Sequence, residues 1–242
     1  MIWYFIKFFE REEWADQFMV GHLYLNTLGY FKGIESAGSA DRGDPTEGVA
    51  MWLQPHDVIM TLKVPNLQLE TTITAKDLAG PIQFSSTYHD NLHLLCLYAM
   101  HSDAARIEDG EATRQEMERL QRQLRIDPKC FELGKFAVVI PAGPFLKQLR
   151  EAFSRQNIAA TGKLVDYYDD AVFHGEIAAS EIPFSKQKRF SYQREFRVCL
   201  KRPAPTADAL IVDIGDLSAI GKKIPANQFP CFNESEVKSG RA

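Results

Sequence analysis

The clearest chemical pattern in this chain lies in one short segment, Phe190–Leu200, which reads FSYQREFRVCL. Polar and apolar side chains alternate along it, which is typical of a β-strand with one face on a core and the other on water or a groove. Because same-face residues of a strand lie about 6.5–7 Å apart, Gln193, Glu195 and Arg197 would stand in a row. The length of that row suits a sugar and its phosphate.

Basic residues surround Glu195 in the sequence. Between Ile182 and Ala207 there are seven basic residues, Lys186 and Arg197 among them, and Glu195 is the only acid. A carboxylate among cations should stay ionised at neutral pH, and the field of the cations would attract a phosphorylated ligand. Alternatively, Glu195 pairs with Arg197 or Arg194 on the surface of an exposed strand.

The loop Asp41–Gly48 is a second candidate, because it places four charged residues among glycines. It could hold a cation through Asp41, Asp44 and Glu47, or present Arg42 to a phosphate. The spacing is not that of an EF-hand, and a loop of this composition can also be a simple turn.

Other polar groups are less specific. Ser85 and Ser86 precede Tyr88 and by themselves predict only a turn. His89 and His93 lack the glutamate of the metalloprotease motif and lie in an extended segment, so we expect no metal there. The chain contains no GxSxG elbow, P-loop or GxGxxG motif, which excludes the common hydrolase, NTPase and Rossmann classes.

The elements that must position these residues predict an α+β fold, because strands come in runs rather than in strict alternation with helices. Further strands are expected at Ile2–Phe9, His22–Asn26, Val58–Val64, Gln68–Ile73, Leu92–Met100, Phe136–Ile140, Leu164–Tyr168 and Leu210–Ile214. Helices are expected at Glu10–Phe18, with Trp14 and Phe18 on one face and Gly21 as its stop, at Ser102–Asp127 and at Pro144–Arg155. We expect one domain over residues 1–232 and a flexible tail over 233–242.

Composition limits the function classes. The 242 residues are 45% hydrophobic and 25% charged, as in ordinary globular proteins, and the net charge of −4 argues against a protein that coats nucleic acid. The apolar run Ile2–Phe9 is too short to span a membrane, and no cleavage site follows it. The four cysteines are far apart and lie among apolar residues, so we expect reduced thiols and a cytoplasmic protein.

Two sets of residues resemble a known family. Gln193-Arg194-Glu195 matches the Q-x-E motif of ADP-ribosyltransferases, on a late strand as that fold requires, and the N-terminal order of aromatic strand, helix, glycine and extended segment is similar. The chain also resembles bacterial proteins that combine R-G-D-x-x-E-G, here Arg42–Gly48, with a late P-F-x-K…Y-x-x-E-x-R segment, here residues 183–197. Some toxins of antiphage toxin–antitoxin systems that ADP-ribosylate RNA are similar to this group.

The resemblance, which spans about residues 2–215, implies a fold and a site. The fold would be an ADP-ribosyltransferase-like split β core, with two packed, mostly antiparallel sheets and flanking helices. Glu195 would be the catalytic glutamate, Gln193 would orient the acceptor, and Lys7 stands where the family has an Arg or His. NAD would be the substrate and no metal would be needed. The residues implied to bind NAD are Lys7, Arg42, Ser85, Ser86, Tyr88, Lys186 and Arg197.

The same resemblance implies partners: an acceptor macromolecule, either RNA or protein, and an antitoxin or chaperone, with no membrane involved. Two alternatives stay open. One is a metal-dependent nuclease that uses Asp41, Asp44 and Glu47. The other is a non-catalytic binding module of a toxin–antitoxin type system, with the basic segment 186–202 and the polar helix 102–127 as its surfaces.

Overall fold

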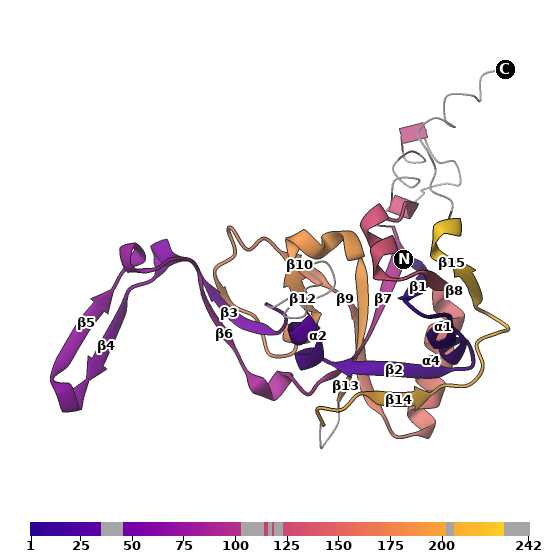
Figure 1. The fold of residues 1–242 in the computed structure, drawn as a ribbon, viewed down its shortest axis with the longest axis horizontal. Coiled ribbons are helices and arrows are strands. Elements are labelled where there is room, and N and C mark those ends of the chain that lie inside the picture. The colour runs from indigo at the N-terminus through magenta and orange to yellow at the C-terminus, as the bar shows by residue number, and fades with distance from the viewer. Residues whose placement is uncertain (35–45, 103–113, 116–117, 119–122, 202–205, 230–242) are drawn as a thin grey trace.

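The computed structural model describes residues 1–34, 46–102, 114–115, 118, 123–201 and 206–229 (Figure 1). It is an α+β fold in which antiparallel strand pairing predominates. The helices that position the site are α1 (Glu12–Met19), α2 (Leu28–Ile34) and α4 (Ala142–Arg155). No helix in these residues is long and apolar enough to cross a membrane.

An eight-stranded sheet forms the body of the molecule. Its strands are β1 (Ile2–Phe9), β2 (His22–Thr27), β7 (His93–His101), β8 (Phe136–Pro141), β9 (Ala159–Leu164), β13 (Glu195–Lys201), β14 (Leu210–Asp213) and β15 (Lys222–Pro225). The order along its main path is β14-β2-β7-β1-β8-β15, while β13 pairs with β7 and carries β9 on its far edge. All of these pairings are antiparallel.

The sheet forks at β7. Tyr98 pairs with Ile6 of β1 on one edge and with Glu195 of β13 on the other, whereas Leu94 pairs with β2 and β13. Strands β1 and β2 therefore share the edge of β7 that lies opposite β13, and they separate from each other along it. Among the described residues, positions 95–97 of β7 have no strand partner on this edge. The fork opens the sheet at its centre.

The main core lies between one sheet face and helices α1 and α4. Phe5 of β1 contacts the rings of Phe145 on α4 and Phe196 on β13, with ring centroids 5.8 and 4.8 Å apart. The apolar stripe of α4 repeats every three to four residues, and its members Phe145, Leu149 and Phe153 are buried, as the spacing predicts for an amphipathic helix. This core holds β1, β7 and β13 in fixed register beneath the fork.

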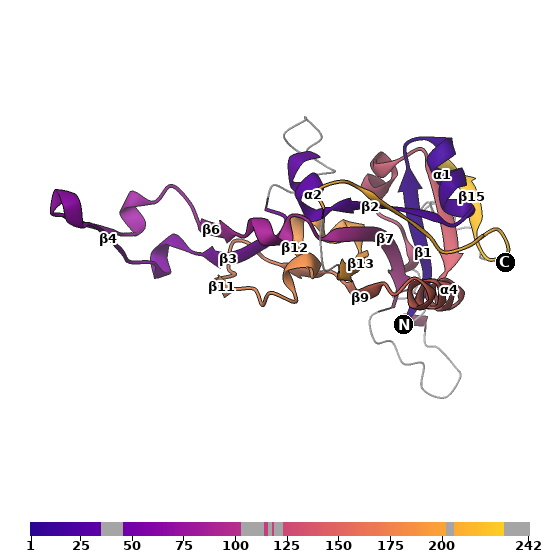
Figure 2. The same cartoon turned by 90° about the horizontal axis from the view of Figure 1, so that it is seen from below.

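A long arm leaves the body. Strands β3 (Val49–Leu53), β6 (Ile82–Ser85) and β11 (Gly175–Glu176) form its base, and the ribbon of β4 (Met60–Val64) and β5 (Leu69–Ile73) forms its far end (Figures 1 and 2). Two short parallel strands, β10 (Asp166–Tyr168) and β12 (Ser185–Gln187), lie between the arm and the sheet.

Several sequence-based expectations are confirmed. The first strand has the expected bounds, and the strands near residues 22, 60, 69, 93, 136 and 210 differ from them by one or two residues. Gly21 ends the first helix with φ of +95°, and a Cβ there would lie 2.1 Å from the carbonyl oxygen of Gly215, so the turn requires glycine.

Other expectations need correction. The first helix buries Ala15 and Phe18, three residues apart, whereas Trp14 is exposed under the guanidinium of Arg11. The single strand expected at Leu164–Tyr168 is interrupted at Val165, because β9 pairs with β13 and β10 pairs with β12. Most of the helix expected at 102–127 and the tail from 233 lie outside the described residues.

Candidate active site at the fork of the sheet

The segment expected to be one strand, Phe190–Leu200, is built from two different elements. Residues 188–193 form a 3-10 helix, Arg194 has left-handed backbone angles with φ of 40°, and β13 starts at Glu195. A 3-10 helix places residues three apart on one face, and Phe190 and Gln193 are both buried on that face. The expectation of a continuous strand was therefore wrong for its first part and correct from Glu195 onward.

Strand β13 has the two faces that its alternation predicts. Phe196, Val198 and Leu200 enter the main core. Glu195 and Arg197 lie on the opposite face, and both are buried there. The expected pairing of Glu195 with Arg197 is present, but it lies inside the protein and not on an exposed strand.

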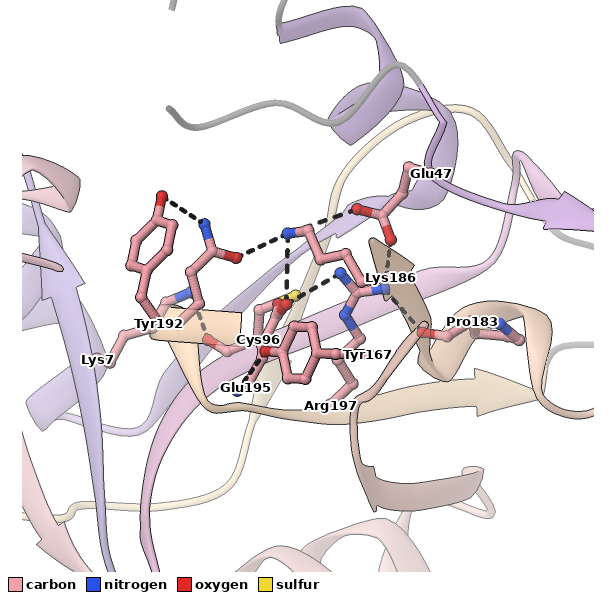
Figure 3. Close-up of polar contacts among 10 residues, drawn as sticks. Lys7, Glu47, Cys96, Tyr167, Pro183, Lys186, Tyr192, Glu195 and Arg197 are labelled. Atoms are coloured by element: carbon pink, nitrogen blue, oxygen red, sulfur yellow. Dashed lines mark hydrogen bonds and ion pairs between the residues drawn. The ribbon is translucent and has the colours of Figure 1, made fainter. Parts of the chain in front are cut away.

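Arg197 is at the centre of a buried ion cluster (Figure 3). Its Nη1 donates to Oε1 of Glu47 at 2.5 Å and to the carbonyl oxygen of Pro183 at 2.8 Å. Its Nη2 donates to Oε2 of Glu195 at 3.0 Å. Arg197 and Glu47 are 1% exposed and Glu195 is 7% exposed. One guanidinium thus joins two carboxylates that are far apart in the sequence.

Lys186 of β12 connects this cluster to Gln193. Its Nζ lies 3.5 Å from Oε2 of Glu195 and 3.7 Å from Oε2 of Glu47, and it donates to Oε1 of Gln193 at 2.8 Å. The backbone N–H of Glu195 donates to the hydroxyl of Tyr167, on β10, at 2.9 Å. Since Tyr167 and Lys186 are paired residues of β10 and β12, the small parallel pair positions both contacts.

The cluster keeps its carboxylate ionised. Burial opposes the charge of Glu195, but Arg197 and Lys186 outweigh it and hold the pKa of Glu195 well below its usual range. The pKa of Lys186 is raised by Glu195 and Glu47 against the effect of burial, so the ammonium also stays charged. Burial and the charge of Glu195 raise the pKa of the Cys96 thiol, which remains protonated.

A cavity of about 200 Å³ lies at the fork of the sheet. Its lining residues come from β1, α2, β7, β12, β13 and the 3-10 helices 128–133 and 188–193; they are Ile6, Lys7, Phe8, Phe31, Cys96, Leu97, Tyr98, Leu133, Lys186, Gln193, Glu195 and Arg197. Gln193 and Glu195 both line it, because the left-handed turn at Arg194 joins their two elements. The Q-x-E residues thus converge on one cavity although they do not share a strand face.

Lys7 supplies the cavity with a cation from β1. Its Nζ donates to the carbonyl oxygen of Cys96, on β7, at 2.9 Å, across the opening of the fork. The four charges of Lys186, Arg197, Glu195 and Glu47 balance one another, so Lys7 adds a net positive charge to the wall. A small, partly apolar cavity with this charge and a fixed carboxylate suits a sugar that carries a phosphate.

The structure places the other predicted binding residues elsewhere. Ser85 ends β6, Ser86 caps the 3-10 turn that holds Tyr88, and none of the three lines the cavity. Arg42, Asp41 and Asp44 lie outside the described residues. Glu47, the third member of the suggested cation site, is engaged by Arg197 and Lys186.

Sequence reasoning missed three contributors to this site. Cys96 and Tyr167 lie in stretches that read as ordinary strands, and no motif marks them. Glu47 was read as a possible cation ligand, whereas it is the buried counter-ion of Arg197. The sequence feature that could have indicated the burial of Glu47 is its position beside Gly48, in a turn that leads directly into the apolar strand β3.

No group of three or more His, Cys, Asp or Glu side chains is placed to hold a metal ion in the part of the chain that the structure describes. Comparison of the chain with protein-family models, with curated proteins and with solved structures found no match.

Proposed function

We propose that the chain is an NAD-dependent ADP-ribosyltransferase whose catalytic carboxylate is Glu195. The observation that carries this proposal is an ionised, buried glutamate that lines a small cavity together with Gln193 and three cations. This is the arrangement that a reaction through a positively charged sugar requires, because a fixed negative charge is already in place when the sugar becomes cationic.

The proposed reaction breaks the bond between the nicotinamide nitrogen and C1′ of the adjoining ribose. Nicotinamide leaves with the bonding electrons, the ribose becomes oxocarbenium-like, and the carboxylate of Glu195 stabilises that charge. A nucleophile of the acceptor then attacks C1′ and gives up its proton to solvent. Gln193, fixed by Lys186 at 2.8 Å, would orient the acceptor, and positioning of this kind lowers the barrier further.

The cavity is large enough for the nicotinamide-bearing ribose and not for the whole dinucleotide, so the diphosphate would lie at its mouth. Lys7 is the proposed diphosphate ligand from the cavity wall, with Arg42 as a further one. Lys186 and Arg197 keep Glu195 in place and in its charged form. The forked sheet supports the proposed relation to the split β core of ADP-ribosyltransferases, because Glu195 lines the cavity that lies at the fork.

We further propose that the chain is a cytoplasmic toxin or antiphage effector. It would modify RNA or a protein and would be held inactive by an antitoxin or chaperone. The acceptor therefore has to be sought among cellular RNA and protein together, and growth arrest on expression of the wild-type chain is the corresponding phenotype.

The test is incubation with NAD labelled in its adenylate phosphate, with cellular RNA or protein, followed by measurement of nicotinamide release and of label in the acceptor. Glu195→Gln keeps the size and hydrogen-bonding capacity of the side chain and removes its charge, so release should fall by a factor of about 100 or more. Glu181→Gln is the matched control, since Glu181 pairs with Lys163 at a partly exposed site, and its activity should equal that of the wild type.

Two outcomes would contradict the proposal. Equal nicotinamide release by wild type and Glu195→Gln would remove the carboxylate from the reaction. Saturable NAD binding by the wild type, with neither release nor transfer for any acceptor fraction, would assign the chain to a binding module instead.

A further inference from the structure

The ribbon at the far end of the arm separates apolar from polar side chains. Residues that stand directly opposite in an antiparallel pair share a face. The register pairs Leu62 with Thr71 and Val64 with Leu69 on one face, while Lys63 stands opposite Glu70 on the other. One face is therefore apolar, and the other carries an ion pair with Nζ and Oε1 3.1 Å apart.

The apolar face lies in solvent although it has the composition of a core surface. On this face Leu69 is 49% exposed and Leu62 is 51% exposed, and Leu67, in the turn at the end of the ribbon, is 73% exposed. The ribbon pairs with no other described strand, and both views show it projecting away from the body (Figures 1 and 2). An isolated two-stranded ribbon is only marginally stable in water, so this one needs a cover.

We infer that a second copy of this chain covers the ribbon, face to face about a two-fold axis. Between residues 59 and 74 the charged side chains are Lys63 and Glu70, which neutralise each other on the opposite face, so the apolar strip has no charge to attract nucleic acid or an anionic membrane. An uncharged strip is complementary to its own copy, and near the axis each residue meets itself.

The exposed apolar area of the ribbon agrees with the area that a dimer interface requires. Leu62, Leu67 and Leu69, with the partly exposed Met60, Val64 and Ile73, offer on the order of 400 Å², within the range of the largest apolar patches on monomers, which are often functional. A standard interface buries roughly 800 Å² per partner, of which a little over half is apolar. The ribbon thus provides about the apolar area that one partner contributes to a stable dimer. This inference is independent of the reaction proposed at the fork.

Cysteine cross-linking tests the two-fold arrangement with adjacent residues. Leu62 is the central residue of the apolar strip, and Thr61 is its neighbour on the polar face. A short bis-maleimide should join Leu62→Cys into a covalent dimer at least about fivefold more efficiently than Thr61→Cys, because only position 62 meets itself at the axis. The wild type, with its four native cysteines, gives the background.

The mass in solution tests the same contact without a cross-linker. Light scattering after size exclusion should give a dimer for the wild type and for Thr61→Asp, and a monomer for Leu62→Asp. Both positions are exposed in the single chain, so circular dichroism should show that all three fold. A wild-type monomer at high concentration, or equal cross-linking at positions 61 and 62, would overturn the inference. Binding of a monomer to neutral lipid vesicles through Leu62 would overturn it in favour of a membrane.

Discussion

At the scale of single residues, the site depends on charged side chains that can be buried because each one faces more than one group of opposite charge. Arg197 donates to Glu47, Glu195 and the carbonyl oxygen of Pro183, and its Nε, buried as well, has no partner within the described structure. Removal of one carboxylate from such a cluster leaves the cation undercompensated in a region of low dielectric. Glu47 therefore supports the site although it does not line the cavity.

Glu47→Gln should accordingly lower the free energy of unfolding by about 3 kcal/mol or more, because Arg197 and Lys186 lose one of the two anions that face them. The measurement is urea denaturation at neutral pH. Glu70→Gln is the matched control, since the Lys63–Glu70 pair is about two-thirds exposed and should contribute less than about 1 kcal/mol. Similar losses for the two variants would show that the Glu47 contact is not a compensated buried pair.

At the scale of elements, the turn at Arg194 brings the two residues of the Q-x-E motif to the same cavity. Left-handed backbone angles are unfavourable for residues other than glycine, and Arg194 adopts them while its guanidinium donates to the carbonyl oxygens of His101 and Gln123. These two hydrogen bonds of the Arg194 side chain thus stabilise a backbone conformation that arginine disfavours. In a continuous strand, Gln193 would not share the cavity with Glu195 in this way.

This turn can be tested by comparing two substitutions that both remove the guanidinium. Asn tolerates left-handed angles and β-branched Val does not, so Arg194→Val should be less stable than Arg194→Asn by about 1–2 kcal/mol. Urea denaturation gives that difference. Arg194→Val should also lose the nicotinamide release proposed above to a greater extent than Arg194→Asn. If the two variants have equal stability, the left-handed turn is not a requirement of the fold.

Sequence patterns predicted the elements that bury one regular face and missed those whose conformation is decided by distant contacts. The bounds of the strand Ile2–Phe9 could be predicted because all of its side chains except Lys7 are apolar. The 3-10 helix before β13 could not be predicted, because the alternation of polar and apolar residues over Phe190–Gln193 is equally typical of a strand. Only the structure shows that Phe190 and Gln193 are both buried, as a 3-10 helix requires. Glu195 was identified from its motif and its basic neighbours, whereas the role of Glu47 depends on a contact 150 residues away.

At the scale of the whole molecule, the fork in the sheet and the ion cluster act on the same residue, Glu195. Strands β1 and β2 separate from each other along β7, Glu195 lines the cavity at this opening, and Arg197 and Lys186 prevent that carboxylate from taking up a proton. The fold gains stability from the same ionisation that the proposed chemistry requires. Stability and activity should therefore share a dependence on the protonation of Glu195.

Stability should consequently fall in acid through this group. The pKa of Glu195 is lower in the folded chain than its ordinary value of 4.5, so its contribution is fully present above that value and is lost as the pH falls through the folded pKa. The free energy of unfolding of Glu195→Gln should lie about 3 kcal/mol below that of the wild type at neutral pH. The two curves should approach each other as the pH falls below about 4, because the carboxyl of Glu195 then takes up a proton in the unfolded chain while it stays ionised in the folded one. Urea denaturation from neutral pH into acid measures both curves. Parallel curves down to the acid transition would mean that the pKa of Glu195 is the same in the folded and unfolded chains, and that the cations of the cluster do not stabilise the charged carboxylate that the proposed reaction needs.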